Sequence, residues 1–77
     1  MLVDERIQRV FREVFDDDAL HVADTTSAKD VPNWDSLSHV KLVLRLEEEF
    51  NIRFSLHEVT TMANVGDLKR AIVARQE

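Results

Sequence analysis

Glycine and proline each occur only once in this chain of 77 residues, as Gly66 and Pro32. Both are used far less than in an average protein, and both are common residues of tight turns. A chain with so few of them makes few tight turns and favours helices. A domain of this length buries only about 60% of its unfolded surface. We therefore expect a single domain, residues 1–77, with a thin core and no room for a deep, walled active site.

Apolar residues at helical spacing predict a first amphipathic helix, roughly from Val3 to Phe15. The stripe consists of Val3, Ile7, Val10, Phe11, Val14 and Phe15. Residues 16–35 show no sustained period and form a long connection, in which we expect one short helical turn. The apolar residues of this connection are spaced to pin it to the core. They are Leu20, Val22, Val31 and Trp34.

A second helix is predicted from Ser36 to Phe50, with Asp35 as its N-cap. One apolar stripe along this helix suits a bundle core. It comprises Leu42, Val43, Leu46 and Phe50. A second stripe lies beside the first and comprises Leu37, Val40 and Leu44. Because a bundle helix needs only one apolar stripe, we expect part of this surface to be exposed.

The rest of the chain predicts a short helix and a final one. Ser55 and Glu58 have the spacing of a capping box, which opens a helix roughly from Leu56 to Met62. Asn64 then caps the last helix. The apolar face of that helix contains Val65, Leu68, Ala71 and Ile72. The predicted fold class is therefore all-α: a small four-helix bundle of three main helices and one short helix, with a long first loop.

The composition excludes several kinds of site and partner. The chain has no cysteine, so disulfides, cysteine-ligated zinc and a thiol nucleophile are impossible. A net charge of -5 argues against nucleic-acid binding and favours partners with basic surfaces, although such a charge also keeps a small protein soluble. The acidic start lacks the pattern of a signal peptide, and no run approaches the roughly 18 apolar residues of a membrane span. We expect a cytoplasmic protein without membrane insertion.

No combination of residues predicts a metal site or a catalytic site. No two of the histidines, His21, His39 and His57, are close enough in sequence to share a helix face, whereas zinc needs three or four converging ligands. The aspartates at 16–18 lack the central glycine of a calcium-binding EF-hand loop. Ser36 and His39 lie nearly on one face, but a catalytic pair also needs an oxyanion hole, an orienting group and a pocket.

The start of the second predicted helix is the strongest candidate for function. Asp35 leaves the Ser36 hydroxyl on the first turn, beside backbone N–H groups that have no partner within the helix. Such a helix end favours a negative group, and a phosphate most of all. Asp-Ser-Leu alone is also an ordinary helix start, but its context sharpens the signal. The serine follows a long loop that ends in an aromatic residue, and the helix closes with Leu-Glu-Glu-Glu-Phe at residues 46–50.

These features together, over nearly the whole chain, resemble the acyl carrier protein family. The resemblance implies that Ser36 carries a 4'-phosphopantetheine arm, with Asp35 as its acidic neighbour. It also implies a surface on the second helix that faces partner enzymes. The residues of this surface are Leu37, Val40, Leu44, Glu47 and Glu48.

The function implied by the resemblance is carriage rather than catalysis. A phosphopantetheinyl transferase would attach the arm from coenzyme A, and the arm's thiol would hold acyl groups as thioesters. The implied partners are acyl-loading, condensing and acyl-transfer enzymes with basic surfaces, served by a monomeric carrier. Acyl cargo is expected between the second and third helices, and the candidate lining is Val43, Leu46, Val59, Met62 and Leu68. The alternatives are a peptidyl or aminoacyl carrier and an unmodified helical adaptor with the same surface.

Four residues depart from the common family pattern. Asn33 and Trp34 replace a glycine and a small or aliphatic residue, and Ser38 and Lys41 replace acidic residues. We expect Trp34 to pack against the start of the second helix and to steady the loop. Contact with the arm or with a partner is the alternative role for its indole.

Positive charge near the middle of the partner-facing surface favours a dedicated fatty-acid, polyketide or lipid pathway over general fatty-acid synthesis. Lys41 and Arg45 lie beside Val40 and Leu44, where they would repel a basic partner. Arg45 can pair with Glu49 one turn on, but Lys41 has no acid within one turn in either direction.

Overall fold

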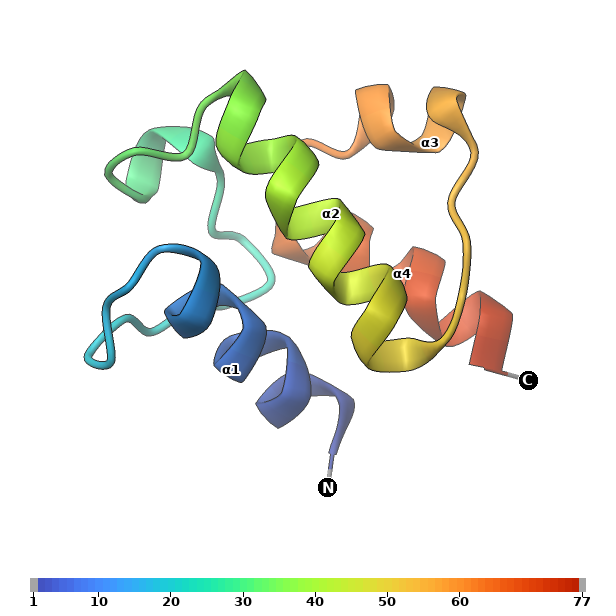
Figure 1. Cartoon of the computed structure of the whole chain (residues 1–77), viewed down its shortest axis with the longest axis horizontal. Coiled ribbons are helices and arrows are strands. Elements are labelled where there is room, and N and C mark those ends of the chain that lie inside the picture. Colours follow the sequence, from blue (N-terminus) through green and yellow to red (C-terminus); the bar gives the residue numbers. More distant parts are fainter. Residues whose placement is uncertain (1, 77) are drawn as a thin grey trace.

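The computed structural model describes residues 2–76, and its regular structure is helical (Figure 1). Four α-helices follow one another: α1 (Val3–Val14), α2 (Ser36–Phe50), α3 (Leu56–Thr61) and α4 (Val65–Gln76). A 3-10 turn, Ala28–Asp30, lies in the connection between α1 and α2. The predicted all-α fold, with three main helices, one short helix and a long first loop, is confirmed.

The helix boundaries are close to the predicted ones. α2 has the predicted bounds, while α1 ends one residue early and α3 ends at Thr61 rather than Met62. After α1, Asp16 adopts a left-handed conformation with φ of 50°, which takes the chain out of the helix. Met62 is extended, with φ of -75° and ψ of 106°. The extended residue leads into the cap of α4, where the Asn64 side chain accepts a hydrogen bond from the Asp67 N–H at 2.9 Å.

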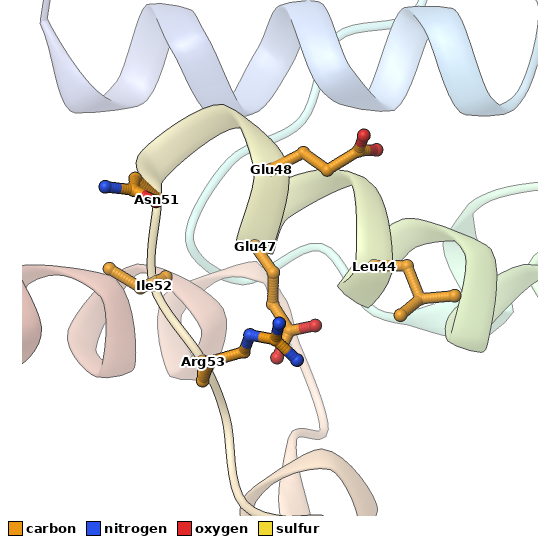
Figure 2. A pocket seen from close by; sticks show the side chains of 6 residues that line it. All are labelled: Leu44, Glu47, Glu48, Asn51, Ile52 and Arg53. Carbon is orange, nitrogen blue, oxygen red and sulfur yellow. The ribbon is translucent and has the colours of Figure 1, made fainter.

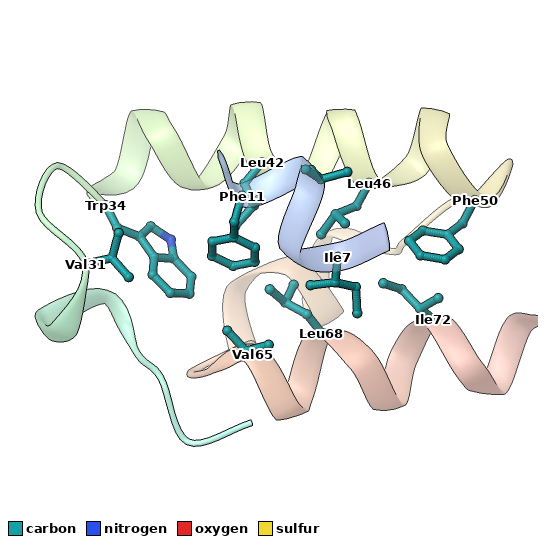
Figure 3. Packing of buried hydrophobic residues seen from close by; sticks show 11 residues of the cluster. Ile7, Phe11, Val31, Trp34, Leu42, Leu46, Phe50, Val65, Leu68 and Ile72 are labelled. Atoms are coloured by element: carbon teal, nitrogen blue, oxygen red, sulfur yellow. The ribbon is translucent and has the colours of Figure 1, made fainter. Parts of the chain in front are cut away.

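The core lies between α1, α2 and α4, whose apolar side chains point toward one another (Figure 3). Its residues are Ile7, Val10, Phe11, Val31, Trp34, Leu42, Leu46, Phe50, Val65, Leu68 and Ile72. The predicted core stripe of α2 is confirmed, because Leu42 and Leu46 are fully buried and Phe50 is 5% exposed. Val43 is buried as well.

Side-chain packing and backbone hydrogen bonds pin the long connection to the helices, as predicted. Its four apolar residues are buried or pack against the core: Val31, Trp34, Leu20 and Val22. The backbone N–H of Gly66 donates to the carbonyl of Asp24 at 2.8 Å. A Cβ atom at position 66 would lie 3.0 Å from that carbonyl oxygen. The one glycine of the chain therefore lies where the connection and α4 approach closely.

An ion-pair network joins α1 to the C-terminal half of α2. Three arginines surround the Glu49 carboxylate, whose side chain is 13% exposed. The N–O distances are 3.0 Å to Arg6, 3.2 Å to Arg9 and 3.3 Å to Arg45. The hydrogen bond from Arg6 and the charges of all three arginines hold the pKa of Glu49 below its ordinary value. Arg45 also pairs with Glu13 of α1, so its positive charge is neutralised by carboxylates within the fold.

We predict that Leu46→Ala destabilises the protein far more than Leu44→Ala. Leu46 is fully buried, and truncating a buried leucine costs about 2–5 kcal/mol of unfolding free energy. Leu44 is 56% exposed, and exposed substitutions usually stay within about 0.5 kcal/mol. Urea or thermal unfolding of the two variants measures the difference. Equal destabilisation would contradict the assignment of the two stripes.

We predict that Glu49→Gln lowers stability by about 1 kcal/mol at neutral pH, the upper end for a partly exposed ion pair. Because folding depresses the pKa of Glu49, its contribution is complete above the ordinary pKa of 4.5. The contribution is lost as the pH falls through the lower pKa of the folded state. Unfolding curves at several pH values should show the two proteins converging in acid.

Glu48→Gln is the matched control for this prediction. Glu48 is exposed, and within the part of the chain that the structure describes it makes no ion pair. A neutral-pH loss as large in Glu48→Gln as in Glu49→Gln would show that the effect comes from net charge rather than from the three arginines.

Candidate functional site

Ser36 is the first residue of α2, and it is exposed at the helix N-terminus. The preceding residue, Asp35, is the N-cap, and its carboxylate accepts a hydrogen bond from the backbone N–H of Ser38 at 3.0 Å. This bond lowers the pKa of Asp35, so the carboxyl group is ionised at neutral pH. Among residues 2–76, no hydrogen bond engages the Ser36 hydroxyl. The cap thus satisfies the helix end and leaves this hydroxyl accessible.

The loop in front of Ser36 is held in one shape by its own residues. Asn33 is left-handed, with φ of 71°, and its carbonyl oxygen accepts two hydrogen bonds. One comes from the Ser38 hydroxyl at 2.6 Å, and the other comes from the backbone N–H of Asp35 at 3.1 Å. Asn33 and Ser38, two of the residues that depart from the common pattern of the resembled family, are therefore hydrogen-bonded to each other across the start of α2.

Trp34 anchors this loop in the core, as predicted. Its side chain is buried, at 7% exposed. The indole meets the ring of Phe11 edge to face, with ring centroids 5.3 Å apart. Its N–H group donates to the imidazole Nδ1 of His39 on α2 at 3.1 Å. The packing role is confirmed, and the indole also lines a hollow beside Ser36.

A hollow of about 600 Å³ adjoins Ser36 between the start of α2 and α3. Residues from α2, α3 and the long connection line it. The apolar part of the lining includes Trp34, Val40, Leu56, Val59 and Met62, and the polar part includes Asp35, Ser36, His39 and Thr60. Its volume lies within the usual range for small-molecule sites, about 300–1,000 Å³. A group attached to Ser36 would therefore have an adjoining, mainly apolar space.

The structure does not bring the five candidate acyl-pocket residues together at this hollow. Val59 and Met62 line it. Val43, Leu46 and Leu68 are buried and are not part of its lining. Helix periodicity identified apolar residues that face inward, but it did not separate residues of the close-packed core from those at its edge. Leu56, which is 80% exposed beside the hollow, was not predicted as part of the site.

The second apolar stripe of α2 is exposed, as predicted. Leu37 is 67% exposed, Val40 is 49% exposed and Leu44 is 56% exposed. From here on, "the apolar stripe" means these three exposed residues together with Leu56 of α3, and not the buried stripe of α2. Exposed apolar side chains grouped in this way are typical of interaction surfaces.

The acidic residues at the end of the stripe have different roles. The Glu47 carboxylate accepts a hydrogen bond from the backbone N–H of Phe54 at 2.8 Å, which fixes the link between α2 and α3. Glu48 is exposed. Both glutamates line a second hollow, of about 460 Å³, together with Leu44 and Arg53. Figure 2 shows these side chains. Sequence reasoning gave the two glutamates one role, because it did not detect the bond to Phe54.

The two cations near the stripe also differ. Arg45 is engaged by Glu13 and Glu49, so its predicted pairing with Glu49 is present and extends to α1. Lys41 is exposed, and within the described residues it has no ion-pair partner. Lys41 therefore keeps an unpaired positive charge on the exposed side of α2.

His39 is placed to organise the site rather than to activate Ser36. Its Nδ1 accepts the bond from Trp34, and its Nε2 lies 3.0 Å from the carbonyl oxygen of Val59. Both ring nitrogens are thus occupied by groups other than the Ser36 hydroxyl.

Among the described residues, no three or more histidine, aspartate or glutamate side chains form a group that could hold a metal ion. No helix in the same part of the chain is long and apolar enough to cross a membrane.

Comparison with known proteins identifies related sequences along nearly the whole chain. A family model described as "Phosphopantetheine attachment site" matches residues 5–72. The acyl carrier protein of Clostridium acetobutylicum is 32% identical over 76 residues, which cover 99% of each chain. The acyl carrier protein of Chlamydia caviae is 30% identical with the same coverage.

Solved structures show the same architecture. The holo acyl carrier protein from Geobacter metallireducens, solved by NMR in solution, superposes with a TM-score of 0.87 at 40% identity, covering 99% of this chain and 91% of that chain. A putative acyl carrier protein from Mycobacterium tuberculosis superposes with a TM-score of 0.84 at 25% identity, covering 99% of this chain and all of that chain. The likeness therefore extends over the whole bundle.

Proposed function

This chain belongs to the acyl carrier protein family, whose members bear a phosphopantetheine attachment site, and from that premise we propose that Ser36 carries the arm. Proteins of this family are carriers and not enzymes. The observation that carries the proposal is the position of Ser36, an exposed serine on the first residue of α2 and beside a hollow. When bound, 4'-phosphopantetheine supplies a thiol that holds an acyl group as a thioester.

The residues around Ser36 fit such a group. The N-terminus of α2 stabilises the negative charge of a phosphodiester, because backbone N–H groups and the helix dipole favour anions there. The Asp35 carboxylate is tied to Ser38, so the cap holds the helix start without occupying the serine. Trp34, buried behind the loop, keeps this start in place while partner enzymes act on it.

The hollow between α2 and α3 is the proposed place for the acyl cargo when it is not in a partner. Its apolar lining includes Val59 and Met62. Methionine is unbranched and adaptable, which suits a wall that must yield to a chain. This assignment replaces the broader pocket expected from sequence, because Val43, Leu46 and Leu68 already fill the core.

The apolar stripe is the proposed contact surface for partner enzymes. Glu48 offers a negative charge at one end, and Lys41 offers a positive charge near the middle. Charge patterns of this kind steer the encounter and exclude wrong partners more than they add affinity. We propose that the mixed pattern serves a dedicated acyl pathway rather than general fatty-acid synthesis.

We predict that the intact mass rises by one phosphopantetheine when the protein is incubated with coenzyme A and a phosphopantetheinyl transferase, and that Ser36→Ala abolishes the gain. Ser27→Ala is the control, since it removes a serine hydroxyl from the long connection outside α2 and should leave the mass gain unchanged. Circular dichroism should show that both variants remain helical. A gain of mass in Ser36→Ala would contradict the assignment, and a folded wild type that takes no group would favour an unmodified adaptor.

We predict that Lys41→Glu improves the protein as a substrate for the enzymes of general fatty-acid synthesis. The reason is that the substitution removes a like charge facing basic partners. Lys29→Glu makes the same change of charge in the 3-10 turn, outside α2, and should have no such effect. Rates of acyl loading and elongation measure the difference. The dedicated-pathway proposal fails if the wild type matches a general fatty-acid carrier and the swap changes nothing.

A further inference from the structure

α3 is the least anchored helix of the bundle. It has only six residues, Leu56–Thr61, and none of them is buried. An isolated helix of this length is unstable in water, so its position depends on the contacts that it makes. Two contacts connect α3 to the other helices. Glu58 forms an ion pair with Arg75 of α4, and the Val59 carbonyl contacts the His39 side chain of α2.

The Val59 carbonyl belongs to the last turn of α3, where carbonyl groups lack partners within the helix. In a longer helix this oxygen would accept from the N–H of residue 63. Here the Ala63 N–H donates instead to the Asp67 carboxylate at 2.9 Å. His39, reaching from α2, lies 3.0 Å from the Val59 oxygen. A side chain of α2 therefore caps the end of α3.

The partners of His39 determine its tautomer. The indole N–H of Trp34 can only donate, so Nδ1 of His39 accepts at 3.1 Å and carries no proton. The proton of the neutral ring is then on Nε2, which donates to the Val59 oxygen. Both hydrogen bonds therefore run in the same donor-to-acceptor direction. Trp34, in the loop before α2, donates to His39 of α2, and His39 donates to Val59 of α3.

We propose that His39 is a positioning residue that holds α3 against the start of α2 and so sets the width of the hollow beside Ser36. Trp34, His39 and Val59 all line that hollow, so the chain of bonds forms part of its wall. The consequence for cargo rests on the proposed function: an acyl group would enter a hollow whose width this bond sets. The positioning itself is a property of the unmodified protein.

The wild-type protein provides a first test that needs no variant. Long-range ¹⁵N–¹H NMR of the unmodified protein distinguishes protonated from unprotonated imidazole nitrogens. We expect His39 to show an unprotonated Nδ1 and a protonated Nε2, and His57, which is exposed, serves as the internal comparison. A protonated Nδ1 and unprotonated Nε2 would overturn the proposal, because the ring could then neither accept from Trp34 nor donate to Val59.

Substitutions test the effect on α3. Glutamine can place an amide N–H near the position of the imidazole Nε2, whereas alanine cannot. We expect His39→Ala to speed hydrogen exchange of the backbone amides at 59–61 roughly fivefold relative to those of α1, as loss of one hydrogen bond implies. His39→Gln should restore most of the protection, and His57→Ala should match the wild type. Unchanged exchange in a folded His39→Ala would overturn the proposal.

A second variant keeps the test valid if His39→Ala does not fold. Trp34→Phe retains an aromatic ring but removes the N–H donor, so Nδ1 of His39 loses its partner and only the bond to the Val59 carbonyl still holds the ring. We expect amides 59–61 of this variant to exchange faster than in the wild type. Unchanged exchange at these amides in a folded Trp34→Phe would overturn the proposal. All of these measurements use protein without the arm. Their results therefore test the role of His39 independently of whether Ser36 is modified.

Discussion

The burial of one apolar stripe of α2 against α1 and α4 is the constraint on which the rest of the structure depends. Once Leu42, Leu46 and Phe50 fill the core, the orientation of α2 is fixed. The neighbouring residues Leu37 and Leu44 then point away from the core and are exposed. The same orientation brings the N-terminus of α2 to the surface. The packing of the core thus leaves both the serine and the exposed stripe accessible.

The loop that precedes Ser36 is held from two sides, and this fixes the start of α2 at which the serine lies. Behind the loop, Trp34 packs edge to face on Phe11. In front of it, Asp35 caps the helix and Ser38 binds the Asn33 carbonyl. Residues that differ from the common family pattern therefore have structural partners in this chain. Lys41 is the charged residue among them, and it makes no ion pair within the described part of the chain, so the specificity proposal depends on it.

Sequence reasoning predicted the elements well because the chain is strongly periodic and carries clear caps. The bounds of α2 followed from Asp35, and the start of α3 followed from the capping box of Ser55, whose hydroxyl accepts the Glu58 N–H. Predicted helix ends that lacked such signals were less accurate. For example, the end of α3 depends on the turn that leads to α4. Periodicity also did not reveal contacts made across the fold. The Phe54 N–H donates to Glu47, and Arg45 donates to Glu13 of another helix. The hollow beside Ser36 depends on how α3 is placed.

The central claim is that Ser36, presented by the packing of α2, bears a phosphopantetheine arm in the cells that make this protein. The most direct measurement is the mass of the protein isolated from those cells, followed by fragmentation of the peptide that contains Ser36. We predict a population heavier than the unmodified protein by one phosphopantetheine, with or without an acyl group, and with the added mass on Ser36. Protein that is entirely unmodified in growing cells, or modified at another residue, would contradict it.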